Sequence, residues 1–88
     1  MDIQDAPHGI NVVIETRGGR VFIGRFDSAN VFTALLHDCD VHDVKAGEDG
    51  ERYIRETATY GIDVKQRDAQ VDIADVARVR LLRDVSKL

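Results

Sequence analysis

The segment from Ile10 to Asp40 constrains the fold of this 88-residue chain more than any other, because apolar residues alternate along it between spaced glycines. Such alternation is the pattern of β-strands, and Arg17-Gly18-Gly19 between two alternating runs predicts a hairpin turn. Gly24 interrupts the second run, and a lone glycine inside a strand marks a bulge or sharp bend. We therefore predict a turn at Gly19, a bend at Gly24, and strands over Ile10–Thr16, Arg20–Asp27 and Val31–Val41.

A hairpin, a strand bent at one glycine and a long third strand are the parts of a very small barrel, whose strands must curl through large angles. We expect an all-β fold: a strongly bent, five-stranded, SH3-like open barrel, with residues 1–88 forming one domain. A chain of this length buries only about 60–65% of its unfolded surface, so that sharing strand edges with other copies would add stability.

The rest of the chain divides into an arm, an insertion and a C-terminal strand. Residues 1–9 form a polar N-terminal arm, residues 10–41 hold the first three strands, and residues 42–70 form a long loop or hairpin. Within the insertion, Arg52–Val64 is rich in strand-forming Tyr, Ile, Thr and Val, which predicts an extended hairpin in which Arg52–Tyr60 pairs with the third strand. Lys65–Asp68 is predicted to be a polar turn.

Residues 71–88 are predicted to hold the last strand and a tail. Two periodicities compete there, because Val76, Val79 and Leu82 lie three apart, as on a helix, whereas Val79 and Leu81 alternate with arginines, as on a strand. The density of β-branched residues favours a strand.

Composition excludes several functions. The net charge of −4 argues against broad, charge-driven nucleic-acid binding, although a local site remains open. The chain has no apolar run near the ~20 residues of a membrane span and no export leader, and its lone Cys39 fits a reducing compartment, so we expect a cytoplasmic protein. It has no phosphate loop, nucleophile elbow or paired acid and base, so we expect neither an enzyme nor a cofactor.

The glycines and apolar residues of the first three strands resemble the first motif of the Sm-like family, small bent barrels that assemble into rings around RNA. The positions of that motif are occupied here by Gly19, Phe22, Gly24, Phe26, Asn30, Phe32 and Ala34, of which the turn glycine, the bend glycine and the apolar residues match. Leu35-Leu36 is closer to the bacterial Sm-like RNA chaperones. The second motif survives only as the spacing of Val71, Val76 and Val79, with Asp72-Ile73 where the family has Arg-Gly, and the stretch between His42 and Gln70 is longer than the usual Sm linker.

The resemblance implies a homo-oligomeric ring of about six or seven copies that binds single-stranded RNA or scaffolds a ribonucleoprotein. Phe32 would stack on a base, and Asn30 would assist it or hold its own turn. Ala34 and Asp72 depart from the pattern, since Ala34 cannot read a base edge and Asp72 would repel phosphate. The predicted oligomer interface is a free strand edge at Val76, Arg78, Val79 and Arg80. The alternative function is a protein-interaction or assembly module with no nucleic-acid role.

The stretch from His37 to Asp43 contains two histidines, one cysteine and three further acids, which raises the question of a metal. Strict alternation would place His37 and Cys39 on one face of their strand. A structural zinc site needs four converging ligands, so we expect no metal within one subunit, and leave open a site shared between subunits at His37 and Cys39.

Overall fold

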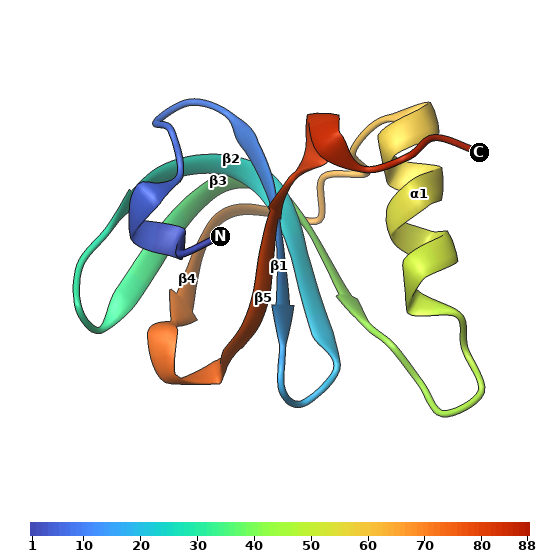
Figure 1. The fold of residues 1–88 in the computed structure, drawn as a ribbon, viewed down its shortest axis with the longest axis horizontal. Helices are drawn as coiled ribbons and strands as arrows, with labels where there is room; N and C mark the ends of the chain where they lie inside the picture. The colour runs from blue at the N-terminus through green and yellow to red at the C-terminus, as the bar shows by residue number, and fades with distance from the viewer.

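The computed structural model describes all 88 residues, which form one antiparallel sheet, one α-helix and short 3₁₀ turns (Figure 1). The sheet order is β4-β3-β2-β1-β5, which leaves β4 and β5 as its two edges. Its strands are β1 (Asn11–Thr16), β2 (Arg20–Ala29), β3 (Thr33–Asp43), β4 (Gln66–Asp72) and β5 (Val76–Leu81). Helix α1 (Gly50–Tyr60) connects β3 to β4, and the 3₁₀ turns cover Ile3–Asp5, Ile73–Asp75 and Leu82–Asp84.

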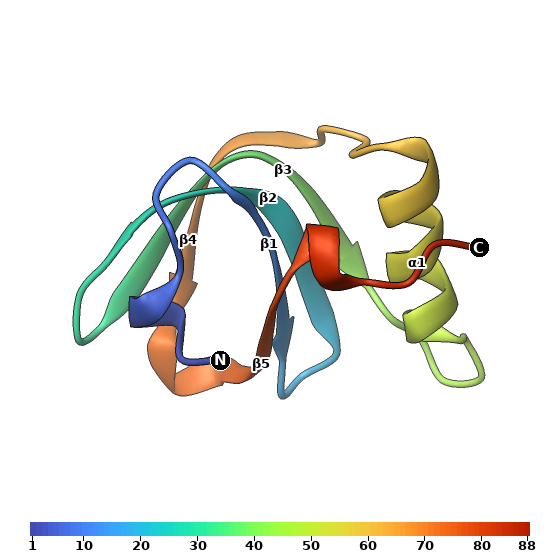
Figure 2. The same cartoon turned by 45° about the horizontal axis from the view of Figure 1, so that its top comes forward.

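Both faces of the sheet are buried over part of their area. On one side, which we call the core face, twelve buried residues from all five strands and the N-terminal arm form the larger cluster, with Ile14 and Leu36 fully buried. On the other side, the helix face, α1 inserts Ile54 against Val13 and Ile23. The N-terminal arm is part of the first cluster, because Ile3 is buried in it, and it lies beside the turn between β2 and β3 (Figure 2).

The expectation of an all-β, strongly bent barrel is wrong. The protein has an α+β fold, in which an open antiparallel sheet, neither closed nor strongly curled, is combined with one helix. β4 and β5 do not pair with each other, and the pairing register shifts beside Gly24 and Asp27 of β2 and again between Glu15 and Thr16 of β1. The strands predicted for the first half of the chain are confirmed to within a few residues.

The extended hairpin predicted for the insertion is also wrong, because α1 occupies most of Arg52–Val64. The Asp49 carboxylate accepts a hydrogen bond from the Arg52 N–H and caps the helix N-terminus. At the other end, the Gly61 N–H donates to the Thr57 carbonyl. These caps, together with apolar residues at helical spacing, override the strand preference of the individual side chains.

The C-terminal half contains two strands where the sequence predicted a turn and one strand. The predicted turn at Lys65–Asp68 runs into β4, whose only buried residues are Ala69 and Val71. The preference for strand over helix is confirmed over Val76–Leu81. The single α-helix, with 11 residues, is too short to span a membrane.

Candidate functional site

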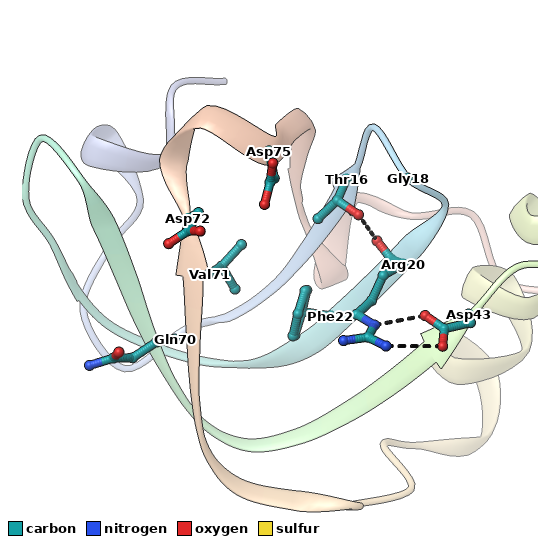
Figure 3. A pocket seen from close by; sticks show the side chains of 9 residues that line it. All are labelled: Thr16, Gly18, Arg20, Phe22, Asp43, Gln70, Val71, Asp72 and Asp75. Carbon is teal, nitrogen blue, oxygen red and sulfur yellow. Dashed lines mark hydrogen bonds and ion pairs between the residues drawn. The ribbon is translucent and has the colours of Figure 1, made fainter.

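A hollow of about 530 Å³ lies between the edge strand β4, the turn that follows it and the turn between β1 and β2 (Figure 3). Phe22 and Val71 are its two hydrophobic lining residues. Its charged residues are Arg20, Asp43, Asp72 and Asp75. Asp72, which was expected from the sequence to be unfavourable to phosphate, therefore lines this hollow.

The charge of this hollow is negative. Arg20 donates from Nε and Nη2 to the two oxygens of Asp43, at 2.7 and 3.1 Å, and this pair lowers the pKa of Asp43 and raises that of Arg20. Asp72 and Asp75 form no ion pair within 4.0 Å, so their charges remain uncompensated. Carboxylates in this position disfavour a phosphate and favour a cationic side chain.

Phe32 and Asn30 lie together in the turn between β2 and β3. The Asn30 side-chain oxygen accepts hydrogen bonds from the backbone N–H groups of Phe32 and Thr33, both at 2.8 Å, so that its amide shapes the turn. Phe32 is 78% exposed and its neighbour Val31 is 72% exposed. Ala34 is buried in the core and offers no group to a ligand.

The two structural glycines have distinct surroundings. Gly19 lies in the turn between β1 and β2 with a φ of +91°, in the left-handed region that favours glycine. Gly24 lies in β2 at a bulge, where a side chain would clash: an added Cβ would be 2.6 Å from Cys39 Sγ and 2.9 Å from the His37 carbonyl oxygen. The absence of a side chain at Gly24 lets β3 approach β2 closely at this point.

The residues of the predicted oligomer interface lie on the edge strand β5, where the Met1 ammonium donates to the Val79 carbonyl oxygen at 3.2 Å, and they differ in exposure. Val79 is 3% exposed and belongs to the core. Arg80 is half-buried and donates to Glu51 of α1 at 2.8 Å and to Glu15 of β1 at 3.2 Å, so it connects elements within the subunit. Val76 is half-buried, and Arg78 is the exposed cation of this edge, 4.0 Å from Glu15.

His37 and Cys39 lie on opposite faces of the sheet, so the prediction that they share a face is wrong. β3 has an extra residue opposite β2 at Asp38, whose φ is +50°, and this bulge reverses the alternation. Cys39 is fully buried on the core face, where burial raises the pKa of its thiol to about 11. A buried, protonated thiol cannot contribute to a metal site between subunits.

Sequence reasoning did not find the buried acid of β3. The Asp40 side chain is 2% exposed and accepts hydrogen bonds from the Tyr53 hydroxyl at 2.5 Å and from Lys65 Nζ at 2.6 Å. The His42 ring stacks on the Tyr53 ring, with the centroids 3.8 Å apart. The sequence does not distinguish Asp40 from its neighbours Asp38 and Asp43, which are not buried. The partners of Asp40 come from the insertion, whose helix was not predicted.

No protein-family model matches this chain, and no curated protein matches it at a significant level.

Proposed function

We propose that this chain is an assembly module whose copies associate by pairing the free edge of β4 in one subunit with the free edge of β5 in the next. The observation that carries the proposal is the sheet order, which leaves one edge at each side of the same sheet. Unpaired strand edges present rows of free N–H and C=O groups that a further strand can satisfy. Because the two edges differ, their pairing is head-to-tail and can close into a ring.

The charges of the two edges support this pairing. β4 buries only Ala69 and Val71, and its exposed residues include Asp68 and Asp72, of which Asp72 also lines the hollow. β5 buries Val79 and Leu81 and exposes Arg78 on the side opposite to the core. When β4 and β5 of two copies pair with their core faces aligned, acidic residues of one meet a basic residue of the other.

A charge exchange tests the assembly. We expect the purified protein to be oligomeric in native mass spectrometry at low salt, and Arg78→Asp or Asp72→Arg to shift it towards the monomer, because each puts like charges on the two edges. The double variant should restore the oligomer. Arg83→Asp makes the same change in net charge outside β5, where Arg83 forms no ion pair, and should leave the mass unchanged. A wild-type monomer at all accessible concentrations would contradict the proposal.

RNA binding is the second candidate, and the exposure of Phe32 favours it. An aromatic ring that is 78% exposed on a turn fixed by Asn30 can stack on a base. If it does, Phe32→Ala will weaken the binding of labelled uridine- or adenine-rich RNA by roughly 5- to 150-fold, the equivalent of about 1–3 kcal/mol. Fluorescence anisotropy at low salt measures this, and Tyr60→Ala is the matched control, since Tyr60 is 80% exposed elsewhere. No binding by the wild type removes this candidate.

A further inference from the structure

His37 is held between two carboxylates that come from different strands. Its Nε2 lies 2.6 Å from Oδ2 of Asp27 on β2, and its Nδ1 lies 2.8 Å from Oδ1 of Asp68 on the edge strand β4. Two bulges create this arrangement, since Asp27 is the extra residue of β2 and Asp38 the extra residue of β3. We call His37, Asp27 and Asp68 the His37 clamp.

The geometry fixes the number of protons on the ring. Ionised carboxylates only accept hydrogen bonds, so a ring that contacts one with each nitrogen must donate from both, and only the imidazolium can do so. A neutral imidazole donates from one nitrogen and presents a lone pair to the other carboxylate. Loss of one proton therefore replaces one of the two hydrogen bonds by a repulsive contact.

We propose that protonation of His37 fastens the edge strand β4 to β2 and β3, and that β4 loosens when the ring becomes neutral. Asp68 is the partner that leaves, because its side chain is 72% exposed, whereas that of Asp27 is 31% exposed. β4 also pairs with β3 alone and buries only two residues, so apart from the His37 clamp it is held by its ladder with β3 and by the packing of Ala69 and Val71. This inference goes beyond the proposed function. Protonation of His37 would regulate assembly only if β4 is the pairing edge.

The surrounding charges set the pH range. Hydrogen bonds to Asp27 and then to Asp68 raise the pKa of His37, and the hydrogen bond to His37 lowers the pKa of Asp27. The other charged or titratable groups nearby are Asp38, which pairs with Arg25 at 2.8 Å, and His8, which contacts the Asp27 carbonyl oxygen. Since His37 has a raised pKa in the folded state, the clamp stabilises fully below the unfolded value of about 6.5 and is lost as the pH rises through the folded value.

An NMR titration combined with hydrogen exchange tests the clamp. We expect the ring of His37 to titrate above about pH 6.5, and Asp68→Asn to lower that midpoint. Protection factors of the β4 amides, corrected for the intrinsic effect of pH, should fall through the same midpoint in the wild type and stay constant in His37→Gln. His42→Gln is the matched control, because His42 forms its hydrogen bond with Glu48, away from β4. In this variant the protection of the β4 amides should still fall through the midpoint of His37.

The titration separates this inference from the assembly proposal. Repeating it in Arg78→Asp, which the assembly proposal expects to be monomeric, should give the same midpoint and the same loss of protection. A wild-type midpoint at or below about 6.5, or β4 protection that does not change through it, would overturn the inference whatever the oligomeric state. The midpoint of His37 and the protection of the β4 amides are both measured in the wild type. They therefore test the inference even if His37→Gln does not fold.

Discussion

Replacing Gly24 by alanine will lower the free energy of unfolding by about 2–3 kcal/mol, because the new methyl group has no space. Its Cβ would lie 2.6 Å from Cys39 Sγ, 2.9 Å from the His37 carbonyl oxygen and 3.0 Å from Cys39 Cα. Two of these three atoms belong to the backbone of β3, so a change of rotamer cannot relieve the contact. β2 and β3 must therefore separate at the bulge, in the centre of the sheet.

Thermal and urea denaturation measure this loss, which corresponds to a decrease in Tm of roughly 10–20 °C for a domain of this size. Gly18→Ala is the matched control: an added Cβ there meets nothing within 4 Å, and the expected change is within about 0.5 kcal/mol. Adding Cys39→Ala should recover only part of the loss, since the carbonyl contact remains. Equal stability of the two glycine variants would show that the close approach of β2 and β3 is not what requires Gly24.

The first half of the fold could be predicted because its signals are local. Alternation and the glycines at positions 19 and 24 locate β1, β2 and β3 in the sequence, and the turn glycine has the positive φ that such a turn requires. The prediction from alternation of which face a side chain occupies was wrong where a strand contains a β-bulge. The bulge at Asp38 depends on pairing with β2, which the sequence of β3 alone does not contain, and it moved Cys39 to the face opposite to His37.

The second half was mispredicted because composition was weighed above capping and periodicity. Tyr53, Ile54 and Thr57 are strand formers by propensity, yet Ile54 and Thr57 lie three apart and are buried on one side of α1. Asp49 before the segment and Gly61 after it were the available helix signals. β4 was missed for the opposite reason, because a short edge strand with two buried residues carries almost no hydrophobic pattern.

The candidate site was less predictable than the fold, since its parts are brought together by tertiary structure. Asp72 was recognised as unfavourable to phosphate, and it does lie in an acidic hollow, but the hollow also needs Asp43 and Asp75 from other elements. Arg78 and Arg80 were both assigned to the oligomer interface, whereas Arg80 donates to Glu15 and Glu51 within the subunit and Arg78 is exposed. Arg80 is paired because α1 places Glu51 beside it, so the sequence of β5 alone does not show which arginine is left exposed.

Replacing Lys65 by methionine will destabilise the protein by about 2–3 kcal/mol, because it leaves the buried carboxylate of Asp40 with the Tyr53 hydroxyl as its one side-chain donor. The expected loss is below the ~3–5 kcal/mol of fully buried pairs, since the Lys65 side chain is 44% exposed and water can partly replace it. Arg67→Met is the matched control, because it also removes one positive charge, and Arg67 is exposed and forms no ion pair.

The pH dependence of this loss identifies its cause. The hydrogen bond to Asp40 raises the pKa of Lys65, so its contribution is complete below the unfolded value of about 10.4 and disappears as the pH rises through the folded value. The difference between wild type and Lys65→Met should therefore be constant near neutrality and shrink in strong alkali. Adding Asp40→Asn to Lys65→Met should restore part of the stability, because it removes the unpaired charge. If Lys65→Met costs no more than Arg67→Met, the pair does not hold the segment after α1 to the sheet.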